Sequence, residues 1–469
     1  RFYLYLIMTK SAEKLYMSYA GKNSEGAALM PSYIIRSMRK MFSHCLKLSY
    51  KDTAQQNSYV TIPRAANSFD NTEIAANVDE DIIDSLTGGR LVGSVTSFEN
   101  FAECPLRYYL RYGVDLKERE EFTFSPVNFG VVLHAVIREV CDEIKKNGES
   151  YYLISEEKRR EMVKRSVAAI TDIYQNSILK DSSRNSFMIK RMEDLADRTV
   201  WAMGEQLKCG DFVPFVFEHK FNMEVGDGDR KQLMSGTIDR VDICENGTDV
   251  YVRIIDYKTG KKDFNIVKTY YGIDIQLMVY MEAAMKLVAK MRPGKNVIPA
   301  GVFYYNISDP IVSATTESAE EIEDKIKGEL RLKGMVNSDK DIAEKMDNTE
   351  GTSLNIPVSR KADGGFDSRR SKVMNTEQFN MLGRFVDVRA IDTADRIAGG
   401  DIRRSPYKDG QFSSCDRCPY GAVCGFSVDL PGCNYRKLKK FDDEVLWNNI
   451  KEGVDENGKK MDTGAEERD

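Results

Sequence analysis

Two strand-like runs joined by a four-residue turn constrain the fold of this chain more than any other feature. The first run, LMSGTIDRVDIC, covers residues 233–244, and the second, DVYVRIIDYK, covers residues 249–258. The turn between them, ENGT, contains the Asn-Gly pair that favours a tight reversal of the chain. We expect an antiparallel hairpin whose second strand is largely apolar until it reaches Asp256 and Lys258.

Helices and further strands are predicted on both sides of this hairpin. Residues 215–223 alternate as a strand does, and residues 299–307 form an apolar, strand-like run. Residues 272–291 are predicted to be helical. An amphipathic helix is predicted over residues 128–144, with one apolar stripe made by Leu133, Val136, Ile137, Val140 and Ile144. We expect an α/β fold in which a mixed sheet is flanked by helices.

The remaining segments are described by simpler patterns. Residues 94–113 begin with N-capping residues and carry aromatics near helical spacing. Polar residues 51–90 are predicted to be a linker or surface loop. Three further predictions are a helical stretch at 155–208, a mixed, largely helical stretch at 315–400, and a frayed polar tail over the last 20 or so residues.

Length and composition set only broad limits. A chain of 469 residues suggests two to four domains, and the net charge of −5 means that any DNA contact must come from a local basic patch. No signal sequence and no apolar run of about 18 residues is present, so we expect a cytoplasmic protein. The chain starts with Arg1 inside an apolar run, which suggests a fragment of a longer protein.

The charged end of the second strand is the first candidate site. Side chains two apart on a strand share a face, so Asp256 and Lys258 are neighbours, and Asp239 can lie opposite or diagonal to Asp256. Converging carboxylates suit Mg²⁺ or Mn²⁺, which can activate water beside a phosphate while the lysine stabilises developing charge. The alternative is an ordinary cross-strand salt bridge.

Four other residues have both a functional and a structural interpretation. His134 could complete a metal shell or be a structural helical histidine. Gln276 and Tyr280 share a helical face, which by itself means little. Glu218 lies on the polar side of its strand, where a solvated edge explains it equally well.

Taken together, these residues resemble the RecB-type branch of the PD-(D/E)XK nuclease superfamily. The matching motifs are Gly130…His134, GTIDRVD, DYKTG and Gln276…Tyr280. The resemblance implies a PD-(D/E)XK core and a DNA nuclease that depends on Mg²⁺ or Mn²⁺. The implied metal ligands are His134, Asp239, Asp256 and the carbonyl of Tyr257; Lys258 would be catalytic, Gln276 and Tyr280 would position DNA or the lysine, and Glu218 would be an auxiliary acid. Lys261 and Lys262 are expected near the DNA backbone.

The cysteines form a second candidate site. Cys415, Cys418 and Cys424 have C-x2-C-x5-C spacing, and in a chain without a secretion signal such a group favours a metal over disulfides. A fourth ligand could be Cys433, which is nearer in sequence, or Cys104. The resemblance implies Cys104, because iron–sulfur members of this branch bracket the nuclease core with one cysteine before it and three after it. A structural [4Fe–4S] cluster would then join the two ends of the domain.

The start of the chain resembles the last motif of superfamily 1 helicases, with Lys10 in place of the usual arginine. Together with the nuclease motifs, this resembles the C-terminal portion of AddB-type helicase/deoxyribonuclease subunits. The expected domains are a helicase-like remnant at 1–50, a linker at 51–90, the nuclease at 91–435 and a polar tail at 436–469. The resemblance implies an AddA-type partner subunit, double-strand-break processing, and cleavage of the 5′-terminated single strand of DNA. The alternatives are a non-catalytic DNA-binding or scaffolding subunit and a stand-alone iron–sulfur exonuclease.

Overall fold

A computed structural model describes most of the chain after residue 91 and short pieces before it. The described residues are 17, 19, 28–41, 77–79, 81–82, 92–117, 126–173, 183–225, 232–313, 316–429 and 433–466. The chain divides into two compact units, Arg1–Phe69 and Asp70–Asp469. In the first unit, α2 (Tyr33–Met41) lies in the segment predicted to be helicase-like. Lys10 and the apolar run at the start of the chain lie outside the described residues.

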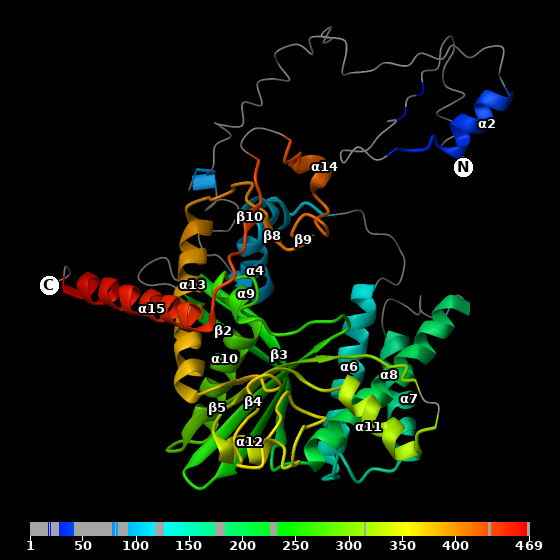
Figure 1. Ribbon diagram of the computed structural model, residues 1–469, viewed down its shortest axis with the longest axis vertical. Coiled ribbons are helices and arrows are strands. Elements are labelled where there is room, and N and C mark those ends of the chain that lie inside the picture. Colours follow the sequence, from blue (N-terminus) through cyan, green and yellow to red (C-terminus); the bar gives the residue numbers. More distant parts are fainter. Residues whose placement is uncertain are drawn as a thin grey trace. The chain divides into compact units, whose positions relative to one another are not determined.

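The second unit is built on a mixed seven-stranded sheet, which confirms the predicted fold class (Figure 1). Its strand order is β1-β3-β4-β5-β6-β7, and β2 pairs with β3 outside this path. Neighbours β2/β3, β3/β4 and β5/β6 are antiparallel, whereas β1/β3, β4/β5 and β6/β7 are parallel. The strands are β1 (Val92–Ser94), β2 (Val213–Val225), β3 (Gln232–Asn246), β4 (Asp249–Lys258), β5 (Asn296–Asn306), β6 (Lys333–Asn337) and β7 (Val373–Met374).

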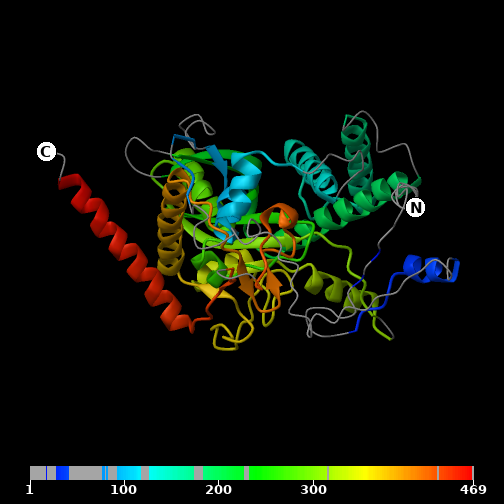
Figure 2. The same cartoon turned by 90° about the horizontal axis from the view of Figure 1, so that it is seen from above.

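Helices cover both faces of this sheet (Figures 1 and 2). Side chains of one face share a hydrophobic core with α6 (Pro126–Lys146), α7 (Glu156–Ile173) and α8 (Ser183–Lys208). The opposite face shares a second core with α4 (Val95–Glu103), α10 (Gln276–Met291), α13 (Thr376–Ala398) and α15 (Asp443–Glu466). Among the described residues, no helix combines the length and apolarity needed to cross a membrane.

Short elements complete the unit. A small sheet has the order β10-β8-β9 and lies close in sequence to the cysteine triplet. The remaining elements are α5 (Pro105–Tyr108), the π-helix η2 (Tyr109–Gly113), α9 (Ile266–Tyr270), α11 (Ala319–Glu329), α12 (Lys340–Met346), β8 (Tyr407–Asp409), β9 (Phe412–Ser413), α14 (Gly421–Cys424) and β10 (Arg436–Lys437).

Most of the predicted elements are present, with two corrections. The stripe predicted for residues 128–144 is buried in one core on α6, and the hairpin is β3 and β4. The helix predicted from residue 272 begins instead at Gln276, because Gly272 has a φ of +75° and Ile275 is the N-cap residue.

The polar tail is the second correction. Most of the final segment is helical in α15 rather than frayed. Leu446 and Ile450 are buried, and Val454 packs against the same core, so an i, i+4, i+8 stripe holds this helix on the domain. The charged residues around this stripe obscure it in the sequence.

Two carboxyl groups meet where α10 packs against α13. Burial raises the pKa of Asp387, and the neighbouring Glu282 side chain raises it further, to about 8. Asp387 therefore holds a proton at neutral pH and can donate it in a hydrogen bond to Glu282.

This pair predicts a pH-dependent stability. A carboxyl whose pKa is raised by folding stabilises the fold fully below its unfolded pKa of about 4, and this contribution is lost as the pH rises through 8. Asp387→Asn cannot ionise, so we expect it to have the higher Tm at about pH 9 and a similar Tm at about pH 4. Asp392→Asn, on the exposed side of the same helix, should follow the wild type in calorimetry. If the Tm values of Asp387→Asn and wild type changed in parallel with pH, the raised pKa of Asp387 would be contradicted.

Candidate metal and nuclease site

The sheet opens between β3 and β4 beside the predicted catalytic residues. The ladder of these two strands ends at the pair Arg240 and Ile255, and β4 then continues beside β5. The N–H of Tyr257 donates a hydrogen bond to Oδ2 of Asp239, at 2.6 Å. Asp239 is thereby held next to residues 256–258 at the point where the strands part.

Strand β2 has a backbone irregularity at Glu218. Its φ angle of +47° lies in the left-handed region that residues other than glycine rarely adopt. The strand changes face here, because Phe217 packs on the α6 side of the sheet whereas Phe221 and Met223 pack on the α10 side. Regular alternation would place all three on one face. Holding a glutamate in this conformation costs about 1–2 kcal/mol.

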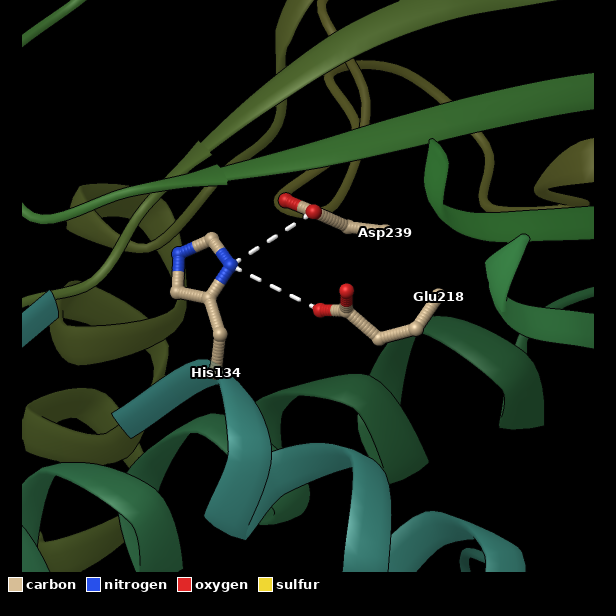
Figure 3. Close-up of side chains that lie close together, drawn as sticks. All are labelled: His134, Glu218 and Asp239. Atoms are coloured by element: carbon tan, nitrogen blue, oxygen red, sulfur yellow. Dashed lines mark ion pairs between the residues drawn. The ribbon is translucent and has the colours of Figure 1, made fainter. Parts of the chain in front are cut away.

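His134, Glu218 and Asp239 converge from α6, β2 and β3 (Figure 3). His134 Nδ1 lies 3.5 Å from Asp239 Oδ1 and 3.8 Å from Glu218 Oε1. One ligand atom from each of the three residues lies within 4.8 Å of the other two. One imidazole nitrogen and two carboxylate oxygens at this spacing could hold one divalent cation.

The protonation of His134 follows from the same arrangement. Burial lowers its pKa, but its interactions with Asp239 and Glu218 outweigh burial and raise the pKa to about 10. An imidazolium therefore balances the two carboxylates at neutral pH. Metal ligation requires the neutral ring, so a bound cation would take the place of this proton.

A hydrogen-bonded chain around Lys258 forms the second part of the site. Lys258 Nζ lies 2.6 Å from Asp256 Oδ2 and donates to Gln276 Oε1 at 3.0 Å. Gln276 Nε2 donates to Asp256 Oδ1 at 3.0 Å and to the hydroxyl of Tyr280 at 2.9 Å. The glutamine and tyrosine predicted to position DNA or the lysine are therefore part of one chain of contacts with the lysine and its carboxylate.

Asp256 is buried and incompletely satisfied. Among the described residues, its Oδ2 has no hydrogen-bond partner, although Lys258 Nζ approaches it closely without a hydrogen-bonding geometry. Burial raises the pKa of Asp256 most, and the charge of Asp239 also raises it, to about 7. The Lys258 ammonium is the cation nearest to this oxygen, and it balances the buried carboxylate.

The motif glycines allow these contacts. A Cβ on Gly236 would lie 2.7 Å from the ring of Phe221 and 3.0 Å from that of Tyr280, so only glycine lets both rings cover β3. A Cβ on Gly130 would contact Thr259 at 3.6 Å, which is an ordinary distance. Gly130 therefore marks where α6 passes the turn after Lys258, but the space there does not require glycine.

The structure thus brings the predicted site residues together in a somewhat different grouping. Asp256 lies outside the group of three close ligand atoms, whereas Glu218, predicted only as an auxiliary residue, lies inside it. The ring of Tyr257 lies edge-on to His134, with centroids 5.9 Å apart. Lys262, expected near the DNA backbone, directs its Nζ to Asp274 at 3.0 Å; its proximity to DNA stays a prediction.

Sequence reasoning missed a group of residues beside Lys258. Asp274 Oδ1 accepts a hydrogen bond from the Tyr304 hydroxyl at 2.6 Å, and Lys262 Nζ lies 4.5 Å from the centre of that ring. Glu99 on α4 belongs to the same group, because it accepts hydrogen bonds from the backbone N–H groups of Ile275 and Gln276. No local pattern signals these residues, because their partners lie on segments that are distant in sequence.

The cysteine segment packs against the end of α4. Cys104 is extended between α4 and α5, and Pro105 opens the second helix. Hydrogen bonds link the two parts: Leu106 N donates to Arg403 O at 3.3 Å, and the Tyr420 hydroxyl donates to Leu116 O at 2.9 Å.

Four free cysteines, Cys104, Cys415, Cys418 and Cys424, lie on the two segments that meet here. Burial is the largest influence on the pKa of the Cys415 thiol, which rises to about 11. The Ser414 hydroxyl donates a hydrogen bond to the carbonyl of Glu103 at 3.5 Å, so the residues next to Cys415 and Cys104 are in contact. Cys433 is buried but is not among the largest influences on the pKa of Cys104, Cys415 or Cys424.

Comparison with known proteins agrees with this geometry. Residues 93–425, well over half of the chain, match the PD-(D/E)XK nuclease superfamily. The chain therefore belongs to that superfamily. The matching segment extends from β1 to the residue after Cys424, so it includes both candidate sites.

Several curated relatives that share one name match almost the whole of this chain. The chain is 30% identical to the B subunit of the ATP-dependent helicase/deoxyribonuclease of Lachnoclostridium phytofermentans, over 99% of this chain and 44% of the relative. It is 31% identical to the protein of the same name from Caldanaerobacter subterraneus subsp. tengcongensis, over 100% and 45%, and 30% identical to that from Clostridium acetobutylicum, over 98% and 44%. The chain therefore spans less than half the length of the curated relatives it matches, and it is similar to them throughout.

The left-handed backbone at Glu218 predicts an unusual stability order. Glycine adopts this conformation freely, so we expect Glu218→Gly to be about 1 kcal/mol more stable than Glu218→Gln in chemical denaturation. If the candidate site holds Mg²⁺, both variants should bind it more weakly than wild type in calorimetry, because each removes one of the two carboxylates of the site. At Lys220, an exposed position on the same strand, the glycine variant should instead be less stable than the glutamine variant, by roughly 0.5–1 kcal/mol. Equal stabilities for the two Glu218 variants would show that the conformation carries no cost.

Proposed function

We propose that this chain is the DNA nuclease portion of a helicase–nuclease complex, and that it hydrolyses phosphodiesters of single-stranded DNA with Mg²⁺ or Mn²⁺. The observation that carries the proposal is the convergence of His134, Glu218 and Asp239 beside the Asp256–Lys258 pair, where β3 and β4 part. A superfamily fold alone would not suffice, because a nuclease-like domain can bind DNA without cutting it.

The residues present fit a divalent cation. His134, Glu218 and Asp239 would hold it, and Asp256 Oδ2, which has no hydrogen bond from any described residue, would be a further ligand. A bound Mg²⁺ would lower the pKa of a water molecule and neutralise charge on the phosphate. Oxygen-rich ligand sets of this kind favour Mg²⁺ and Mn²⁺ over softer metals.

The other side chains would position the reacting groups. Lys258 is anchored by Asp256 and Gln276, so its ammonium can orient an attacking water or stabilise charge developing on the phosphate oxygens. Tyr280 accepts a hydrogen bond from Gln276 and so limits the movement of this glutamine and of the lysine that it binds. The site acts in this view as a preorganised set of charges rather than as a source of covalent chemistry.

The cysteines would hold a structural metal cluster. Cys104 lies at the end of α4, and the hydrogen bond from the Ser414 hydroxyl to the carbonyl of Glu103 brings the segment of the cysteine triplet beside it. Four thiolates from two such segments can hold an iron–sulfur cluster. We propose a [4Fe–4S] cluster whose role is to join α4 to the end of the domain.

The relatives extend the proposal beyond this chain. Their name describes one of the subunits of an ATP-dependent helicase/deoxyribonuclease, and therefore one part of an assembly. We propose that an AddA-type helicase–nuclease subunit is the partner, that the complex processes double-strand breaks for recombinational repair, and that this domain cuts the 5′-terminated strand. Duplexes labelled at one 5′ or one 3′ end, digested by the reconstituted complex, test the strand assignment.

Removing the Asp256 carboxylate tests the nuclease assignment. We expect Asp256→Ala to reduce Mg²⁺-dependent cleavage of single-stranded DNA by at least about a hundredfold, since it removes a cation ligand and the partner of Lys258. Asp249→Ala, at the opposite end of the same strand, should cut at the wild-type rate, and both variants should remain folded in calorimetry.

Other results of this assay would favour the alternatives. Undiminished cutting by Asp256→Ala would refute the site. DNA binding without cleavage in Mg²⁺ or Mn²⁺ would indicate a non-catalytic DNA-binding or scaffolding subunit. Full activity of the complete subunit without any partner would favour a stand-alone iron–sulfur exonuclease.

Replacing Cys104 and Cys433 separately tests the cluster. We expect Cys104→Ser to lose bound iron, the brown colour and thermal stability, because it removes a ligand and the link to α4. Cys433→Ser should retain the iron. A colourless wild type with stoichiometric zinc, and loss of that zinc only in Cys433→Ser, would replace the proposal by a local zinc loop.

A further inference from the structure

The N-terminus of α10 is capped by a side chain from a distant helix. Glu99 on α4 accepts hydrogen bonds through one oxygen, Oε1, from the backbone N–H of Ile275 at 2.9 Å and of Gln276 at 3.0 Å. The N-cap residue Ile275 has no side chain able to serve this purpose. Glu99 therefore satisfies amides that would otherwise lack an intrahelical acceptor.

The cap bears directly on the proposed catalytic lysine. Glu99 binds the backbone N–H of Gln276. The side chain of the same glutamine accepts a hydrogen bond from Lys258 and donates one to Asp256. A shift of the first turn of α10 would carry this side chain away from both groups.

Other contacts fix the segment just before α10. Asp274 is bound by Lys262 and Tyr304, and its carbonyl accepts a hydrogen bond from the Thr269 hydroxyl at 2.7 Å. The backbone of Lys262 exchanges two hydrogen bonds with the side chain of Asn306, each 3.0 Å long. The loop after Lys258 and the start of α10 are thus both fixed, and Glu99 is the contact that comes from α4.

We propose that Glu99 is a positioning residue of the nuclease site, which holds Gln276 and, through it, Lys258 in the reactive arrangement. The inference rests on the proposed function for its catalytic consequence. Its structural part, the dependence of Lys258 on a carboxylate of α4, stands on the contacts alone.

Three variants of α4 separate this role from general stability. Glu99→Ala removes the cap. Glu99→Gln retains an oxygen that can accept from both amides. Glu103→Ala is the matched control, because Glu103 lies one turn further along α4 and pairs with Arg107, four residues on.

The first measurement is chemical labelling of lysines, read by mass spectrometry of the intact fold. Lys258 is shielded by Gln276 and Asp256, so we expect its labelling to rise at least about threefold in Glu99→Ala and to stay near wild type in Glu99→Gln and Glu103→Ala. Lys286, an exposed lysine on the same helix α10, provides the internal reference. Unchanged labelling of Lys258 in Glu99→Ala would overturn the proposal, as would an equal rise in Glu103→Ala.

The second measurement is steady-state cleavage of single-stranded DNA. Misplacing a catalytic group lowers kcat by about ten- to a hundredfold, and we expect this in Glu99→Ala with KM for DNA unchanged and with substantial rescue in Glu99→Gln. A change in KM alone, or no rescue by glutamine, would overturn the positioning role. Increased labelling of Lys258 in a protein that shows no Mg²⁺-dependent cleavage at all would instead refute the proposed function and leave the structural contact intact.

Discussion

The hydrogen bond between Tyr257 N–H and Asp239 is the interaction on which the site depends. Where the ladder of β3 and β4 ends, a buried amide would be left unpaired, at a cost of about 1–3 kcal/mol. Asp239 Oδ2 accepts that amide, and its Oδ1 faces His134 at 3.5 Å. One carboxylate thus lets the two strands separate and also forms part of the candidate cation site between them.

A buried ionic group fixes the strands just before they part. Asp242 accepts two hydrogen bonds from Arg240, at 2.7 and 2.6 Å, and one from Arg253 at 2.9 Å, and all three residues are almost fully buried. Although burial raises the pKa of Asp242, the two guanidinium groups outweigh it and hold that pKa below its usual range. Such groups add little net stability, but breaking one leaves a buried charge unpaired. We infer that this group sets the register of β3 against β4, and therefore where the gap lies.

Much of the fold could be predicted from the sequence because its signals are local. The stripe on α6, the alternation of β2 and the turn between β3 and β4 each depend on residues within a short window. The site residues were found by their order and spacing along those elements. Their exact grouping was not, because it depends on tertiary contacts: Glu218 joins His134 and Asp239, whereas Asp256 faces Lys258 and Gln276.

The features that the sequence did not reveal are those set by distant partners. Nothing around Glu218 predicts a left-handed conformation, since glutamate ordinarily avoids it. Glu99 caps a helix about 176 positions further along the chain, beyond the reach of any periodicity. The late start of α10 was predictable in part, because Gly272 is a plausible helix breaker.

The placement of α4 at the start of the domain has a consequence for synthesis. Its partners are made much later: β3 pairs with the preceding strand β1, Glu99 contacts the start of α10, and the cysteine triplet follows some three hundred residues after Cys104. At about 5–20 residues per second, a ribosome needs roughly 15–60 s to cover that distance. Phe98 lacks its core until β3 and α10 have been made, and Phe101 lacks the side chain of Ile397 for longer still. The contacts of α4 with Ser414 and Arg436 are therefore the last of these to become available, and a chain that stops before Ser414 lacks both of them.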